Sequence, residues 1–169
     1  MENKTKGYKS KERKKRYGEV FTPDWLVRDM CDLLPSEIWS NIESTVLDPT
    51  VGTGNFPVEI LARKYSHCKT EKDGLKALAS VVGVDIQQDN VDECRERLLR
   101  QYIEYFPNAS AFAVLCAMAI LRNNIMCDDF LNPSDKLKAM GFTPCEKYIK
   151  ALEKMKKKRL KEKMLGDKK

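Results

Sequence analysis

The sequence predicts an α/β fold with a mainly parallel, doubly wound sheet. Three short apolar runs, at 45–48, 81–86 and 124–127, have the length and composition of buried strands, and helical patterns separate them. A glycine turn joins the first strand to a helix, which is the usual arrangement around a nucleotide-type ligand. We therefore expect these strands to lie side by side, with a ligand site at their carboxyl ends.

The charges predict one central domain between two basic segments. Residues 1–18 carry eight Lys/Arg and two Glu, and residues 146–169 carry eleven Lys/Arg and four acids. Since the chain has 31 Lys/Arg and 25 Asp/Glu in total, residues 19–145 have 12 basic and 19 acidic residues, a net charge of −7. Basic arms on an acidic body favour nucleic-acid binding, although charged termini can also serve solubility alone. We expect a flexible basic arm at 1–16 and a ligand-binding domain at 17–145.

The segment 146–169 is expected to form a basic helix or tail. Its sparse apolar stripe is typical of a solvated amphipathic helix, or of one that docks to nucleic acid or to a partner subunit.

The composition argues against several classes of protein. The apolar share of 42% is enough for a core, but no apolar run approaches the ~20 residues that a bilayer span needs. The N-terminus lacks the apolar stretch of a signal peptide. The six cysteines are too scattered for a Cys-x-x-Cys pair, and the single His67 cannot complete a common zinc site. We expect free thiols, a cytoplasmic location and no metal or membrane association.

The first helix expected after the basic arm runs from about Asp24 to Leu34. Thr22 is a suitable cap for it, and Pro23 fits its first position. The helical spacing predicts an apolar face made of Trp25, Leu26, Met30, Leu33 and Leu34. A second short helix, around 36–42, is expected to lead into the first strand.

The turn after the first strand has the sequence Asp-Pro-Thr-Val-Gly-Thr-Gly-Asn-Phe, residues 48–56. Gly52 and Gly54 let the backbone approach a ligand without a Cβ in the way, and Asn55 is a suitable cap for the next helix. A phosphate-binding P-loop would need Lys-Ser/Thr after its glycines, and a dinucleotide fingerprint would need a small residue where Pro57 stands. The leading aspartate would repel phosphate, so it suits a cationic or amino-bearing ligand.

This string resembles the S-adenosylmethionine-binding motif of adenine-specific DNA amino-methyltransferases, Asp-Pro-x-x-Gly-x-Gly-x-Phe, and it matches every fixed position. Upstream, the segment from Gly18 through Phe21, Thr22 and Pro23 resembles the one that holds the carboxylate end of the cofactor in that family. The resemblance implies a three-layer, Rossmann-like α/β/α domain, S-adenosyl-L-methionine as cofactor and DNA as partner. It also implies a role in DNA methylation and restriction-modification in a bacterial or phage-type setting. The alternative is a structural turn in an unrelated α/β protein.

The second strand ends in Asp85, where a carboxylate can accept hydrogen bonds from both hydroxyls of a ribose. Asp85 matches the ribose-binding acid of the family, and Ile86 matches the apolar residue beside the adenine. The alternative is an aspartate that caps the next helix, and both roles can hold together. Between the glycine turn and this strand we expect a helix to about residue 65, a polar loop and a helical turn near 75–80.

Two helices are expected between the second and third strands. The segment 87–106 has a helical stripe that favours a core face over a base-stacking platform. The stripe consists of Val91, Cys94, Leu98, Tyr102 and Tyr105. The segment 109–121 is almost continuously apolar, so we expect a helix buried against the sheet.

The third strand is followed by Asp-Asp-Phe-Leu, residues 128–131, where the family often has Gly-Asp-Phe-Leu. The resemblance implies that Asp129 accepts from the adenine amino group of the cofactor and that Phe130 packs beside the ring. The cofactor-binding residues expected from the whole pattern are Phe21, Thr22, Asp48, Pro49, Gly52, Gly54, Asn55, Phe56, Asp85, Ile86, Asp129 and Phe130.

The family performs its chemistry with Asn/Asp-Pro-Pro-Tyr/Phe, which accepts from the target amino group and stacks on the flipped base. The sequence contains no such tetrapeptide; Asn-Pro-Ser-Asp at 132–135 is the nearest string and predicts a turn. The resemblance therefore covers the cofactor half, residues 17–131, with a sheet truncated after its third or fourth strand, and we assign no catalytic residue. Two functions stay open. One is a reduced or split methyltransferase that needs a partner chain, and the other is an inactive cofactor- and nucleic-acid-binding protein.

Overall fold

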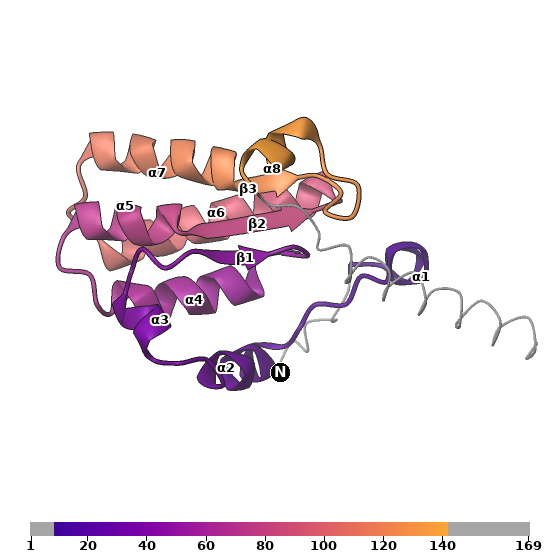
Figure 1. The fold of residues 1–169 in the computed structure, drawn as a ribbon, viewed down its shortest axis with the longest axis horizontal. Coiled ribbons are helices and arrows are strands. Elements are labelled where there is room, and N and C mark those ends of the chain that lie inside the picture. The colour runs from indigo at the N-terminus through magenta and orange to yellow at the C-terminus, as the bar shows by residue number, and fades with distance from the viewer. Residues whose placement is uncertain (1–8, 142–169) are drawn as a thin grey trace, which may run out of the picture. The chain divides into compact units, whose positions relative to one another are not determined.

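The computed structural model describes residues 9–141, drawn in colour in Figure 1. The chain divides into two units between Cys127 and Asp128, and each unit is described by itself. The predicted basic helix or tail at 146–169 lies outside the described residues. Across residues 9–141, no helix combines the length and the apolar character needed to cross a bilayer.

Three parallel strands form the sheet of the first unit. They are β1 (Val46–Asp48), β2 (Val81–Asp85) and β3 (Ile125–Cys127), in the order β1-β2-β3. The register pairs Asp48 with Gly83 and Asp85 with Cys127. The α/β class and the parallel pairing are confirmed. Within residues 9–141 the strand order advances in one direction only, so the three-layer, doubly wound arrangement stays a prediction.

Helices connect the strands, and in the view of Figure 1 the strands run between α4 below and α7 above. The stripe predicted for the long helix is its core face, since Val91, Cys94, Leu98 and Tyr102 have no exposed surface, whereas Tyr105 is 46% exposed. The helices of the first unit are α1 (Lys11–Tyr17), α2 (Asp24–Asp32), α3 (Glu37–Ser40), α4 (Asn55–Tyr65), α5 (Glu71–Ala79), α6 (Gln88–Tyr105) and α7 (Ala111–Asn124).

Part of the predicted flexible arm, 1–16, is helical; residues 1–8 of it lie outside the described residues. Lys11–Tyr17 form α1, with the Ser10 side chain accepting from the Arg13 N–H and Gly18 ending the helix at φ +70°. A hydroxyl cap and a left-handed glycine are the usual start and stop signals of a helix. The prediction of a flexible arm weighed the dense positive charge above these local signals.

The buried face of α2 differs from the predicted one. Val27 and Cys31 are its buried residues, while most of the predicted apolar face, including Trp25 at 61% exposed, faces solvent. Val27 and Cys31 lie one helical turn apart, on a helix that packs against α4. Thr22 does not cap α2, because Pro23 occupies the cap position and no side chain bonds there.

Two helix starts also differ from the prediction. Gly54, not Asn55, is the cap residue of α4. The predicted helical turn near 75–80 is the end of a longer helix, α5, which begins with a reciprocal capping box between Thr70 and Asp73. This signal, a threonine followed three residues later by an acidic residue, was present in the sequence.

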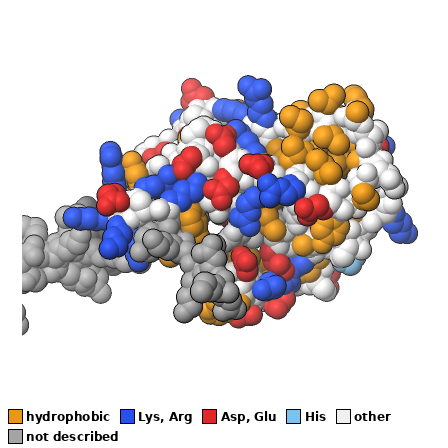
Figure 2. All heavy atoms as spheres, turned by 180° about the vertical axis from the view of Figure 1, so that it is seen from behind, with side chains coloured by type: hydrophobic (Ala, Val, Ile, Leu, Met, Phe, Trp, Pro, Cys, Tyr) orange, Lys and Arg blue, Asp and Glu red, His pale blue; other side chains and the backbone are white. Residues whose placement is uncertain are grey.

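The helix α7 is buried on one face only, whereas the sequence predicted a helix buried against the sheet. Its small residues Ala113 and Ala117 face inward, while Phe112 (76% exposed), Leu115 (62%) and Met118 face solvent. Alanine lets α7 approach its neighbours α5 and α6 closely, which turns the larger side chains outward. In Figure 2, apolar side chains gather at the end of the molecule where α7 begins.

A fully buried lysine lies between the segment before β1 and the end of α5. The ammonium of Lys64 donates to the Ser80 Oγ at 2.6 Å, to the Ile42 carbonyl at 3.3 Å and to the Ser44 carbonyl. Burial away from water lowers the pKa of Lys64 to about 8. Lys64 therefore joins these segments through polar contacts inside the core.

Candidate functional site

The loop after β1 folds over the carboxyl end of β2. The Val51 N–H donates to the Val84 carbonyl at 2.8 Å, and the Gly52 N–H donates to the Asp85 Oδ2 at 3.0 Å. A Cβ on Gly83 would lie 2.7 Å from the Val51 side chain, so the glycine in β2 makes room for the loop. These contacts bring Asp48 and Asp85, the last residues of β1 and β2, to the same edge of the sheet.

The predicted glycine turn is present. Gly52 and Gly54 have φ values of +53° and +92°, in the left-handed region that favours glycine. A Cβ on Gly52 would lie 3.3 Å from the ring of Phe21, and one on Gly54 would lie 2.7 Å from the Cys94 Sγ. The turn is therefore packed between the segment before α2 and the helix α6.

One carboxylate oxygen of Asp48 accepts a hydrogen bond, and the other has no donor within residues 9–141. Its Oδ1 accepts from the Thr50 N–H at 3.1 Å, whereas its buried Oδ2 has no hydrogen-bond partner among the described residues. Burial raises the pKa of Asp48, and the nearby charge of Asp85 raises it further, against the effect of the Thr50 hydrogen bond. A buried carboxylate oxygen without a donor is costly, and an amino-bearing cation would supply the missing partner.

Asp85 is held in a fixed orientation by backbone and side-chain donors. Its Oδ1 accepts from the Gln87 N–H at 2.7 Å and from the Asn90 amide at 3.3 Å, and its Oδ2 accepts from Gly52. Since a carboxylate has about four acceptor positions, Asp85 can still accept from a ligand hydroxyl. The adjacent Ile86 is half exposed. The bond to Gln87, the cap residue of α6, shows that Asp85 also steadies the start of that helix.

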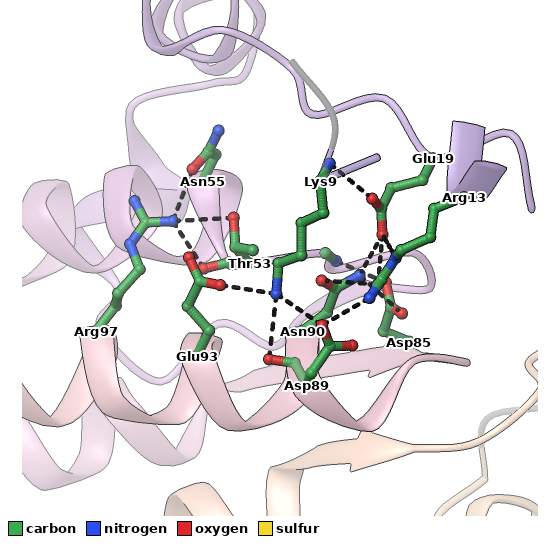
Figure 3. A network of polar contacts seen from close by, with 11 residues as sticks. Lys9, Arg13, Glu19, Thr53, Asn55, Asp85, Asp89, Asn90, Glu93 and Arg97 are labelled. Atoms are coloured by element: carbon green, nitrogen blue, oxygen red, sulfur yellow. Dashed lines mark hydrogen bonds and ion pairs between the residues drawn. The ribbon is translucent and has the colours of Figure 1, made fainter. Parts of the chain in front are cut away.

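The two sequence motifs meet through Asn55. Its amide nitrogen donates to the Thr22 carbonyl at 2.7 Å, and its amide oxygen accepts from Arg97 at 2.7 Å, as Figure 3 shows for the Arg97 side. Pro49 is half-buried in the loop, and Phe56 packs against the hydrophobic core. Phe56 therefore supports the loop from the core side.

The comparisons with known proteins show the family of the chain. The family model described as N-6 DNA methylase matches residues 7–111, which is more than half of the chain and includes the glycine turn, Asp48 and Asp85. The chain belongs to the N-6 DNA methylase family.

A curated relative supports the same assignment. The chain is 29% identical over 133 residues to the Type II methyltransferase M.VspI of Vibrio sp. (strain 343), a match that covers 79% of the chain and 24% of the relative. The chain thus spans about a quarter of the length of this relative. No solved structure gave a significant match.

An ion-pair network that the sequence did not predict joins α1 to the start of α6, beside Asp85 (Figure 3). Arg13 pairs with Glu19 and Asp89, both at 2.6 Å, and Lys9 pairs with Asp89 at 3.0 Å and with Glu93 at 2.8 Å. The ion pair with Arg13, followed by that with Lys9, lowers the pKa of Asp89 to about 2. Residues 9–19 of this N-6 DNA methylase family member are therefore held next to the predicted ribose-binding residue.

Asn90 connects this network to the site. Its amide nitrogen donates to Glu19 at 3.2 Å and to Asp85 at 3.3 Å, and only 2% of its surface is exposed. Burial alone would raise the pKa of Glu19, but hydrogen bonds from Lys9, Asn90 and Arg13 outweigh it and lower the pKa. The charged residues of α6 have the pattern of a solvated helix face, so no local signal indicates these long-range partners.

The last two predicted site residues belong to the second unit, which also contains α8 (Asp135–Ala139). Asp129 accepts from the Leu131 N–H and from the Asn132 amide, both at 2.9 Å, in the turn that follows β3 in the sequence. Its neighbour Phe130 is half-buried. The string 132–135 forms the turn before α8 and the start of that helix, with Ser134 as the cap.

Proposed function

We propose that the chain binds S-adenosyl-L-methionine and forms the cofactor-binding part of a DNA adenine methyltransferase. The observation that carries the proposal is the buried oxygen of Asp48 that has no hydrogen-bond partner among the described residues, beside the glycine turn. It suits the amino group of the cofactor, while Asp85 suits the ribose hydroxyls and the backbone of Gly52 and Gly54 leaves room for close approach. The Phe21–Thr22 segment, Asn55 and Pro49 complete that side of the site. Bound S-adenosylmethionine would supply an electrophilic methyl group.

The adenine end of the cofactor would lie against Ile86, with Asp129 and Phe130 as its further contacts. The family model matches residues 7–111 only. The roles of Asp129 and Phe130 are therefore proposed from the resemblance of the Asp-Asp-Phe-Leu string alone. We also propose that the whole enzyme has a three-layer, Rossmann-like α/β/α fold, and that β1, β2 and β3 are part of its doubly wound sheet.

Binding of the cofactor can be tested directly by calorimetry. We expect Asp85→Ala to weaken S-adenosylmethionine binding by on the order of 1–3 kcal/mol, because ribose hydroxyls lose their charged acceptor. Asp92→Ala is the matched control, since Asp92 is an exposed aspartate on α6 whose side chain bonds to Gln88 and Arg95 of the same helix. Equal affinity in Asp85→Ala and the unaltered chain would remove Asp85 from the site.

We propose that the chain by itself does not transfer the methyl group. The amino group of adenine is a poor nucleophile, so transfer needs acceptors at that group and a stacked, extruded base. The sequence offers no Asn/Asp-Pro-Pro-Tyr/Phe, and the string 132–135 is taken up by a turn and a helix cap. The catalytic elements would come from another segment or from a partner chain.

A methyl-transfer assay separates this proposal from its alternatives. We expect no methylation of unmethylated DNA by the isolated chain, and methylation once the missing elements are supplied in trans. Cofactor binding that never leads to transfer with any such addition would favour the second function, an inactive cofactor- and nucleic-acid-binding protein. Methylation by the isolated chain that disappears on changing Asp48 would contradict the proposal and point to an atypical catalytic element.

We also propose that the basic segments bind DNA, in the described part of the chain through exposed cations of α1. Lys9 and Arg13 already pair with acids, whereas Lys11, Lys15 and Arg16 are exposed. Replacing these three exposed cations by Gln is expected to weaken DNA binding. The plot of log K against log salt should also become flatter, by about 0.9 for each DNA phosphate that the variant no longer neutralises.

A control with the same change of charge is available elsewhere. Lys69, Lys72 and Arg122 are exposed cations in the loop before α5, in α5 and in α7. Their replacement by Gln is expected to leave the salt slope unchanged. Equal slopes for both triple variants would show that α1 does not contact the phosphates.

A further inference from the structure

Arg97, on α6, reaches the glycine turn with its guanidinium group. Its Nη1 lies 2.7 Å from the Thr53 carbonyl, 3.3 Å from the Thr53 Oγ1 and 2.7 Å from the Asn55 Oδ1. All these acceptors are uncharged, and Thr53 is only 7% exposed. The group thus holds two residues of the loop from one point, in the arrangement that Figure 3 shows.

The guanidinium also determines which way the Asn55 amide faces. A guanidinium group can only donate, so it takes the amide oxygen and leaves the amide nitrogen to donate to the Thr22 carbonyl. The flipped amide would place two donors together at Arg97 and two acceptors together at Thr22. Arg97 therefore controls the bond that fastens the Phe21–Thr22 segment to the turn.

We infer that Arg97 is a positioning residue for the cofactor site, acting through Asn55. This inference rests on the proposed function. Arg97 holds the turn that carries Gly52 and, through Asn55, it also holds the Thr22 backbone. We infer that it keeps both beside Asp48, whose Oδ2 has no donor among the described residues. It acts mainly on the amino-acid end of the cofactor site, because Asp85 at the ribose end is also held by the Gln87 N–H and the Asn90 amide, outside the turn.

Two other arginines of α6 provide matched comparisons. Arg95 donates to the Ile125 carbonyl at 2.6 Å and so holds β3, away from the glycine turn. Arg100 is exposed and pairs with Glu96 one turn away on the same helix. The three side chains have the same chemistry on one helix, but of these three it is Arg97 that donates to the turn.

The test compares a ligand that has the amino-acid end with one that lacks it. S-adenosylhomocysteine and methylthioadenosine share adenine and ribose, and calorimetry gives the ratio of their affinities. We expect Arg97→Met to lower the affinity for S-adenosylhomocysteine about tenfold, because a set of charge-assisted hydrogen bonds is removed, with a change of at most about twofold for methylthioadenosine. Arg100→Met should leave both affinities unchanged, and Arg95→Met should lower the melting temperature while keeping the ratio.

A second variant keeps the test decisive if Arg97→Met folds poorly. Asn55→Asp retains an acceptor for Arg97 but cannot donate to the Thr22 carbonyl, so it should lower the same ratio. An unchanged ratio in either folded variant would overturn the inference and leave the proposed function standing. No binding of S-adenosylhomocysteine by the unaltered chain would overturn the proposed function, and the inference with it.

Discussion

Gly54→Ala is expected to lower the free energy of unfolding by roughly 2–5 kcal/mol, the sum of backbone strain and overpacking. The residue has a φ of +92°, which an alanine adopts only at a cost, and the new Cβ would lie 2.7 Å from the Cys94 Sγ and 3.4 Å from the Cys94 Cβ. Cys94 is fully buried, so its side chain has no solvent-filled space to move into. Urea denaturation followed by circular dichroism measures the change.

Gly18 provides the control for this substitution. Its φ is +70°, but a Cβ there would have no neighbour within 4 Å, so Gly18→Ala isolates the backbone cost of about 1–2 kcal/mol. Adding Cys94→Ala to Gly54→Ala should recover the part of the stability change that comes from overpacking. A Gly54→Ala variant as stable as Gly18→Ala would show that the side chain of Cys94 does not constrain the turn.

Lys64 is expected to make the protein more stable as the pH rises from about 8 to about 10.5. The pKa of Lys64 in the folded state is about 8, below its ordinary value of 10.5, so between these values the unfolded chain binds more protons. Stability therefore increases with pH across this window, by at most roughly 3 kcal/mol from this residue, and the gain is absent below pH 8.

The contribution of Lys64 can be isolated with Lys64→Met, which keeps a long side chain without the charge. We compare the free energies of unfolding of the two proteins at several pH values. Burial raises the pKa of Cys68 to about 11 and that of Cys94 to about 12, which gives the opposite slope at alkaline pH, but both thiols are present in both proteins. A difference between the two proteins that does not change with pH would contradict the assignment.

The sequence was sufficient where the structural requirement is local. The glycine turn could be predicted because positive φ values need glycine, and the strand before it because its run is short and apolar. The buried stripe of α6 followed from helical spacing. In each case, neighbouring residues in the chain hold all the information.

The sequence was not sufficient where contacts with distant segments determine which residues are buried or paired. In α2, both Val27 with Cys31 and the stripe around Trp25 are apolar, and only packing against α4 selects the first. In α7, nearly every residue is apolar, and the small volume of its alanines determines which face turns inward. Glu19 and Asn90 form a hydrogen bond beside the site although they are about 70 residues apart in the chain, and no local sequence pattern indicates such a contact.

The contacts of the N-terminal segment set an order of events during synthesis. Lys9 and Arg13 are made 76 to 80 residues before their partner Asp89, and Thr22 is made 33 residues before Asn55. The ends of such distant contacts meet only after the intervening chain exists, so α1 and the segment after it dock late. Residues 9–22 thus dock after segments that follow them in the chain, and a nascent chain halted before α6 would carry Lys9 and Arg13 without these acidic partners.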